Sequence, residues 1–200
     1  MKLKLIDGLD DIKQAVRNAA FRSHLEYQYN PKYEVTCKAK CNHCCSRRVV
    51  VTIAEALIIR EYLIQKDLWK ETLKRAKSKQ ELSAEIDTST WFAMNIKCPI
   101  LNEESGLCEA YEVRPPPCST HLVSSDPSAC DPWSSSSYSY QKIDTSPIIE
   151  EYDKVMSRVL SRSPLSFRLP IPNALVVAEI MAERKFEDFE SYISAIGRDL

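Results

Sequence analysis

Glycine is scarce in this chain, with only Gly8, Gly106 and Gly197 among 200 residues. Phosphate-binding loops and dinucleotide-binding turns need several closely spaced glycines, because the backbone itself must approach the phosphates. The scarcity therefore excludes the glycine-rich nucleotide-binding folds. The sequence also lacks the GxSxG motif of serine hydrolases and the HExxH motif of zinc proteases, so neither enzyme class is indicated.

Neither a large net charge nor a long apolar run is present. Lys and Arg total 27 against 28 for Asp and Glu, which gives a formal net charge of −1. This balance provides no overall attraction to nucleic acid, so we expect no nucleic-acid partner. No apolar run approaches the ~20 residues of a membrane span, and the start, MKLKLIDGLDDIKQAV, lacks a secretory signal. We therefore expect a cytoplasmic protein without a membrane partner.

Cysteine, in contrast, is abundant and clustered. The first group has the sequence CKAKCNHCC over residues 37–45, the second comprises Cys98, Cys108 and Cys118, and Cys130 follows alone. Disulfides are rare in a reducing cytoplasm, so clustered thiols there indicate metal binding or redox chemistry.

Helical periodicity precedes and follows the first cysteine group. Apolar residues recur at helical spacing over 9–29. Thr52 and Glu55 form a capping-box pattern, which predicts a helix that ends at about Gln65. Asp67 is expected to cap the helix after it.

Helical patterns return near the C-terminus, at 148–160, 175–181 and 186–196. The predicted fold class is therefore mainly α. We expect a small helical bundle with an irregular cysteine-rich metal-binding region and short extended segments.

The chain shows no firm domain boundary, so 1–200 is predicted to be a single domain. Its cysteine-cluster metal-binding region covers 37–118. Within it, prolines and a glycine turn favour short extended pieces over 98–118, and the three prolines at 115–117 oppose a helix. The stretch 124–146 is rich in Ser, Asp and Pro and is typical of a surface loop.

The first cysteine group has a spacing suited to chelation. Cys37, Cys41 and Cys44 follow the pattern CxxxCxxC, which lets one short loop wrap three thiolates around one metal or one corner of a cluster. Cys45 is adjacent to Cys44, and neighbouring side chains diverge on an extended backbone. We therefore expect one of this pair to face a second site, the protein core or a redox role.

The second group adds three thiols. Cys98 precedes Pro99, and a Cys-Pro pair also ends ferredoxin-type cluster sequences. Cys108 and Cys118 follow at equal intervals of ten residues. Seven thiolates suffice for one four-cysteine site with three to spare, or for two sites. Thiolates select zinc, copper(I) or iron–sulfur clusters, and both tetrahedral zinc and a 4Fe-4S cluster are compatible with these residues.

The three histidines are weaker candidates for ligands. His43 lies within the first cysteine group and His121 lies three residues after Cys118, so either offers a nitrogen ligand. The alternative for both is a surface residue or a hydrogen-bonding partner of a ligand. His24 falls in the first predicted helix and is expected to be structural or exposed.

Three ordered blocks, CKAKCNHCC, KCPIL and GLCEAYEVRPPPC, resemble the YkgJ-like cysteine-cluster family, also called the CxxCxxCC domain. Members of that family are described as zinc- or iron-chelating proteins. The resemblance covers about 37–118. It implies that seven cysteines form the chelating set: Cys37, Cys41, Cys44, Cys45, Cys98, Cys108 and Cys118.

The resemblance also implies roles for two other residues. Tyr111, Arg114 and Pro115 match the family's Tyr-x-x-Arg-Pro block, which makes Tyr111 and Arg114 candidates for cofactor binding. Arg114 would donate hydrogen bonds to thiolates and offset their negative charge, unless it forms an ion pair at the rim. The chain departs from the family pattern at Ser119, where arginine is common, and at Cys130, which has no counterpart.

Two classes of function are compatible with these residues. The resemblance extends to flagellin lysine methylases, which are associated with an iron–sulfur cluster, and this implies a redox or protein-modifying enzyme with a protein substrate. The radical S-adenosylmethionine enzymes share the CxxxCxxC spacing, but they need glycine-containing cofactor loops that this chain lacks. The alternative is a non-catalytic zinc-binding structural or interaction module, or a metal-delivery protein.

Overall fold

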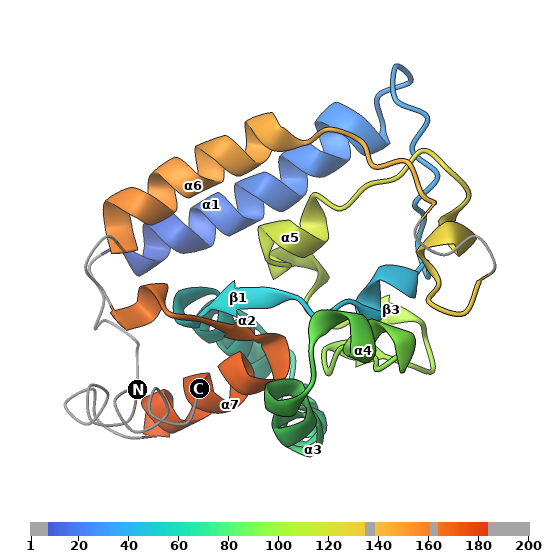
Figure 1. The fold of residues 1–200 in the computed structure, drawn as a ribbon. Coiled ribbons are helices and arrows are strands. Elements are labelled where there is room, and N and C mark those ends of the chain that lie inside the picture. The colour runs from blue at the N-terminus through green and yellow to red at the C-terminus, as the bar shows by residue number, and fades with distance from the viewer. Residues whose placement is uncertain (1–7, 135–138, 161–163, 184–200) are drawn as a thin grey trace.

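The chain folds into helices with two small antiparallel strand pairs, as the computed structural model in Figure 1 shows for residues 8–134, 139–160 and 164–183. The predicted mainly α class is confirmed. Within these residues, no helix is long and apolar enough to cross a membrane.

The α-helices are α1 (Leu9–Arg22), α2 (Ile53–Gln65), α3 (Trp69–Glu85), α4 (Thr88–Ala93), α5 (Pro116–Ser119), α6 (Ser146–Leu160) and α7 (Ile171–Glu183). The strands are β1 (Val50–Thr52), β2 (Leu101–Asn102), β3 (Leu107–Cys108) and β4 (Arg168–Pro170). Shorter helical turns are the π-helical η1 (Ser23–Gln28) and the 3-10 turns η2 (His43–Ser46), η3 (Tyr111–Val113), η4 (Pro127–Cys130) and η5 (Pro164–Ser166).

The hydrophobic core forms around α2, which is apolar on nearly every side. Ile53, Leu57 and Leu63 are each at most 1% exposed. A helix of this kind must be covered on several faces. α7 and α1 pack against it, α3 packs against α7, and α6 runs beside α1 (Figure 1).

The capping box at the start of α2 is confirmed. The Thr52 hydroxyl accepts a hydrogen bond from the Glu55 amide at 3.2 Å, and the Glu55 carboxylate accepts one from the Thr52 amide at 2.7 Å. Thr52 also ends β1, which pairs with β4 and places Val51 opposite Leu169. The pairing joins the start of α2 to the start of α7, and α2 ends at Gln65 as predicted.

The first predicted helix is confirmed and has two parts, because η1 continues α1 to Gln28. Gly8 precedes α1 with a φ of 95°. A Cβ atom at that position would lie 2.5 Å from a methyl group of Val159 in α6. The glycine therefore permits the close approach of α1 and α6.

The hairpin of β2 and β3 confirms the predicted extended pieces, with Leu101 opposite Cys108. Two other expectations were wrong. Leu68, not Asp67, precedes α3, and Asp67 has a left-handed φ of 58° with no capping bond to the helix. The prolines at 115–117 were expected to oppose a helix, but Pro116 begins α5. A proline is tolerated in the first turn, because a backbone N–H there has no acceptor within the helix. The helix predicted over 186–196 lies outside the described residues.

Loss of the α2 cap is expected to lower the free energy of unfolding. Thr52→Ala removes one acceptor and leaves the buried Glu55 carboxylate with fewer partners, so we expect a loss of about 1 kcal/mol or more in urea denaturation. Thr88→Ala, at an exposed position in α4, serves as the matched control and should have little effect. Equal stabilities for the two variants would contradict the structural role of the capping box.

Candidate metal centre

A single cavity of about 720 Å³ brings the cysteine segments together. It lies where the end of the α1–η1 helix, the 37–47 segment, the 98–118 segment and the start of the following loop converge. All eight cysteines are free thiols and all line the cavity. These are Cys37, Cys41, Cys44, Cys45, Cys98, Cys108, Cys118 and Cys130.

The first cysteine group bends through two tight turns. Lys40 has a left-handed φ of 69°, and the Cys41 amide donates to the Lys38 carbonyl at 3.0 Å. η2 then carries Cys44 and Cys45. The backbone there is a 3-10 turn rather than the extended chain that the sequence reasoning assumed, and both thiols line the same cavity.

A backbone hydrogen bond ties the second cysteine group to the first. The Cys98 amide donates to the Cys45 carbonyl at 2.8 Å. The β2–β3 hairpin carries Cys108 beside Cys98, and Gly106 forms its turn with a φ of 71°. A Cβ atom on Gly106 would lie 3.3 Å from the side-chain nitrogen Nδ2 of Asn42. The hairpin turn therefore lies directly against the first cysteine group.

Side chains of α3 bind the backbone and side chains on both sides of the β2–β3 hairpin. Arg75 donates to the Pro99 carbonyl at 2.8 Å and forms an ion pair with Glu109, which also accepts from Thr72 at 2.9 Å. The Glu109 side chain is 7% exposed, so this carboxylate is shielded from water and needs its charged and hydrogen-bonding partners. One arginine therefore fixes the residues that follow both Cys98 and Cys108.

One turn further along α3, Lys79 donates to the Lys97 carbonyl at 2.7 Å, and the Lys97 ammonium donates to the Ser46 hydroxyl at 2.8 Å. These bonds fix the residues beside Cys98 and Cys45. The sequence reasoning missed Arg75 and Lys79. A signal was present, since both share the helix face of the buried residues Thr72 and Ala76 at spacings of three and four.

α5 positions Cys118. The Cys118 amide donates to the Pro115 carbonyl at 2.8 Å, and the Thr120 hydroxyl donates to the Pro116 carbonyl at 2.7 Å. The Ser23 hydroxyl of η1 donates to the Ser119 carbonyl at 2.6 Å. Cys118 is thus anchored to the first helix as well as to its own turn.

A separate set of bonds holds Cys37 and Cys130. The Thr36 amide donates to the Val123 carbonyl at 3.0 Å, which joins the start of the first group to the loop that leads to Cys130. His43 pairs with Asp131 at 3.2 Å, next to Cys130. In the described part of the chain, this pairing leaves His43 outside the cavity lining, whereas Cys130 belongs to it and is 6% exposed.

The charged groups around the cavity are all cationic. Among the residues that the structure describes, Lys38, Lys40, Arg47 and Arg114 line it, and no Asp or Glu does. The Arg114 guanidinium lies 3.8 Å from the centre of the Tyr111 ring, and its buried Nε has no hydrogen-bond partner within the described residues. Both residues of the Tyr-x-x-Arg-Pro block therefore face the thiols.

His24 also lines the cavity, although the sequence predicted only a structural or exposed role for it. Its Nε2 lies 2.6 Å from the Tyr111 hydroxyl. Burial lowers the pKa of His24, and the nearby Arg114 charge lowers it further. The imidazole is therefore neutral at pH 7 and forms one hydrogen bond with the tyrosine hydroxyl. No sequence motif marked this residue, because the contact spans 87 positions.

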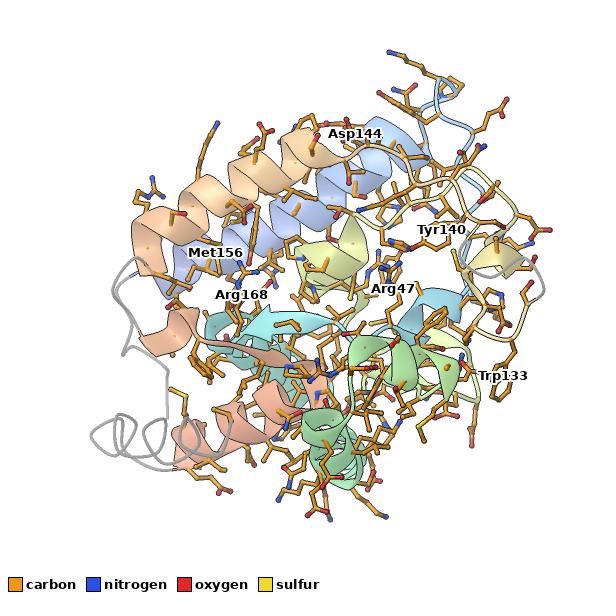
Figure 2. All side chains as sticks on the ribbon, viewed as in Figure 1. Arg47, Trp133, Tyr140, Asp144, Met156 and Arg168 are labelled. Carbon is orange, nitrogen blue, oxygen red and sulfur yellow. The ribbon has the colours of Figure 1, made fainter. Side chains whose placement is uncertain are left out.

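Arg47 lines another side of the cavity, and Figure 2 shows Arg47 and Tyr140 facing each other. The Arg47 guanidinium donates to the Tyr140 hydroxyl. His121 packs edge-on against the Tyr140 ring, with 5.5 Å between ring centres. His121, a predicted candidate, thus lines the cavity with its buried Nε2 unpartnered among the described residues.

Most of the thiols are held in the protonated form. Burial raises the pKa of Cys98 to about 12 and that of Cys130 to about 11, and it also raises the pKa values of Cys37, Cys41, Cys108 and Cys118. Cys44 differs, because a hydrogen bond from the Cys45 thiol lowers its pKa to about 7, helped by the Arg114 charge. A bound metal would therefore displace protons from most of these thiols.

The thiols surround the cavity rather than meeting at one point. Among the described residues, no three Cys, His, Asp or Glu side chains lie close enough together to hold a metal ion as they stand. The donor chemistry nevertheless fits a thiophilic metal, because eight sulfur atoms and no carboxylate of the described chain face the same space.

A comparison with protein-family models matches residues 36–145, more than half of the chain, to the CxxCxxCC model, described as "Putative zinc- or iron-chelating domain". The chain belongs to the CxxCxxCC family. The resemblance of the three cysteine blocks is thereby confirmed, and metal chelation by the cysteines of this CxxCxxCC domain is supported. Searches of curated proteins and of solved structures gave no match.

Arg75 is expected to support metal binding without touching the metal. Arg75→Met removes the donor that fixes the Pro99 carbonyl and leaves Glu109 without its ion-pair partner, so we expect metal affinity to fall by roughly 10-fold or more. Competition with a chromophoric chelator measures this affinity. Lys74→Met, an exposed substitution on the same helix, is the control and should leave the affinity unchanged.

His121 is expected to titrate far below an ordinary histidine. Burial lowers its pKa from 6.5 to about 4. As the pH falls, the unfolded chain takes up this proton before the folded chain does. The contribution of His121 to the free energy of unfolding is therefore complete above pH 6.5 and is lost as the pH falls toward 4.

NMR titration of the imidazole C2 proton measures the pKa directly, with His121→Gln assigning the resonance. A midpoint near 6.5 would contradict the burial of this ring.

Proposed function

We propose that the thiol-lined cavity binds an iron–sulfur cluster of the 4Fe-4S type, and that the protein is a redox or protein-modifying metalloenzyme. The observation that supports this most is the lining itself: eight thiols and no carboxylate of the described chain face one open cavity. Thiolates without oxygen ligands select iron–sulfur clusters, zinc or copper(I) over hard cations.

The positive charges of the lining favour a metal centre whose thiolate ligands give it a net negative charge. Four thiolates and their metal carry net negative charge, and buried negative charge needs nearby cations or hydrogen-bond donors. Arg114 and Arg47 lie among the thiols, and Arg114 has no acidic partner within the described residues. Hydrogen bonds to ligand sulfurs also tune the potential of a cluster, which is a role that Arg114 is placed to serve.

The open mouth of the cavity supports a reactive rather than a purely structural role. Structural zinc sites are closed, whereas catalytic sites keep a position open to substrate. Here apolar side chains at the mouth remain exposed, including Phe21 at 62%, Leu25 at 54% and Tyr29 at 72%. Exposed apolar side chains that gather around a cavity are typical of binding surfaces.

The Tyr111–His24 pair gives this mouth a means of moving protons. The tyrosine hydroxyl donates to the neutral imidazole or accepts from it. When bound, a cluster would supply one-electron chemistry. His24 and Tyr111 would bind an organic substrate beside it and exchange a proton with it.

Analysis of anaerobically purified protein tests the proposal. We expect several iron atoms and acid-labile sulfide per chain, with a broad visible absorption that dithionite bleaches reversibly. Cys98→Ser should lower the iron content strongly, because it removes one of the proposed thiolate ligands, while Ser128→Ala, at an exposed position, should not. A colourless protein that contains zinc and no sulfide would contradict the cluster and support the non-catalytic zinc module or metal delivery instead.

A further inference from the structure

The cavity contains an arginine without a counter-charge. Among the residues that the structure describes, the half-buried Arg114 forms no ion pair or hydrogen bond, and its guanidinium lies 3.8 Å from the centre of the Tyr111 ring. Arg60 and Arg75, which are also half-buried, each pair with a glutamate. A guanidinium that is partly shielded from water needs such an acceptor. An anion from outside the chain therefore fits beside Arg114.

The rest of the lining favours the same kind of ligand. Lys38, Lys40 and Arg47 also line the cavity, and no Asp or Glu of the described chain does. A cavity with cations and no carboxylate attracts an anion. The fork of Arg114 matches the two oxygens of one carboxylate. Because a guanidinium carries five N–H groups, it can bind a carboxylate and still donate to a ligand sulfur.

The entrance of the cavity is apolar and aromatic. Phe21, Leu25 and Tyr29 line it and remain exposed to solvent. Their spacing of four residues along α1 and η1 places them on one side of the helix. Leu107 of β3 is a further exposed apolar side chain of the lining. Apolar side chains that gather at a cavity are typical of ligand-binding sites, so this entrance suits the apolar body of a ligand.

A row of ring contacts leads from this entrance to Arg114. At the end of the π-helical η1, the Tyr29 amide donates to the His24 carbonyl at 2.9 Å, a bond that spans five residues. The Tyr29 ring stacks on His24 with 5.7 Å between ring centres. The Nε2 atom of His24 lies 2.6 Å from the Tyr111 hydroxyl, and Arg114 covers the Tyr111 ring. The apolar entrance and the unpaired guanidinium therefore belong to one wall.

We propose that the cavity binds a small organic carboxylate, whose anionic group pairs with Arg114 and whose apolar body lies against Phe21, Leu25 and Tyr29. The cavity volume of about 720 Å³ is in the range of sites for small molecules. A small molecule fits better than an acidic protein segment, because Arg114 is half-buried within the cavity rather than exposed on the surface. The inference rests on the proposed function, in which an organic substrate binds beside the metal centre, and adds the chemical class of that substrate.

Calorimetric titration of the anaerobically purified full-length chain with three ligands tests the inference. The ligands are 2-naphthoate, the neutral 2-naphthalenemethanol and the cationic 2-naphthylmethylammonium, which share one apolar body and differ in charge. We expect 2-naphthoate to bind roughly 10-fold more tightly than the alcohol, because only the carboxylate offers a charged acceptor to Arg114. The ammonium ligand should bind most weakly.

Variants separate the anionic contact from the apolar contact. Arg114→Gln should lower the affinity for 2-naphthoate by roughly 10-fold and leave that for the alcohol unchanged. Phe21→Ala should weaken both ligands by the same factor, since it removes a contact with their shared naphthalene body. Arg17→Gln, at an exposed position of α1 outside the lining, is the matched control and should change neither affinity.

Circular dichroism checks that each variant keeps its helices. If Arg114→Gln does not fold, Arg114→Lys replaces it in the test, because lysine keeps the charge but loses the fork. It should show a smaller loss of affinity, confined to 2-naphthoate. The ligand series on the wild-type chain needs no variant.

The outcomes separate this inference from the proposed function. Equal affinities of the wild-type chain for the acid and the alcohol, or an unchanged preference for the acid in Arg114→Gln, would overturn the inference. Binding of an acetylated Glu-Phe-Glu peptide without binding of 2-naphthoate would also overturn it and indicate an acidic protein segment.

Iron and sulfide contents are measured on the same preparations. A chain that contains the cluster and shows no preference for the acid would contradict only the carboxylate site. A chain without a cluster that still prefers the acid would contradict the proposed metalloenzyme and support the carboxylate site.

Discussion

The 2.8 Å hydrogen bond from the Cys98 amide to the Cys45 carbonyl is the contact on which the cysteine-lined cavity depends. It joins two segments that lie more than fifty residues apart in the sequence. Everything on the α3 side reinforces it: Arg75 and Lys79 hold the backbone on both sides of Cys98, and Lys97 reaches Ser46 beside Cys45. Main-chain hydrogen bonds and the side chains of α3 therefore position the cysteines on both sides of this contact.

Helix α3 presents charged side chains both to water and to the cysteine-lined cavity's backbone. Lys70, Lys74 and Lys77 of α3 face water, while Arg75 and Lys79 on the neighbouring face donate to carbonyl groups next to the cysteines. A carbonyl left unpaired there would cost free energy comparable to a lost hydrogen bond. Cationic residues serve well in this position because they also lower the cost of thiolate charge nearby.

Much of the architecture could be predicted from local patterns. The capping box at Thr52, the helical spacing over 9–29, 148–160 and 175–181 and the Gly106 hairpin all depend on residues close in sequence, and each was found as predicted. The contribution of Cys130 and His24 to the cavity could not be predicted, because each reaches it through contacts across many tens of residues. The start of α3 was missed for a local reason: Asp67 adopts a left-handed conformation, so its carboxylate does not cap the helix.

The separation of the hydrophobic core into two clusters has a consequence for how the chain would unfold. The larger cluster surrounds α2 and α7, whereas a small one, formed around Tyr27, Leu122 and Ile148, lies beside Cys37. A metal that joined Cys37 to the distant 98–118 segment would close a long loop and reduce the conformational entropy of the unfolded chain. That restraint acts mainly on the small cluster, since the larger one is already packed without it. A chelator would therefore loosen the small cluster before the large one.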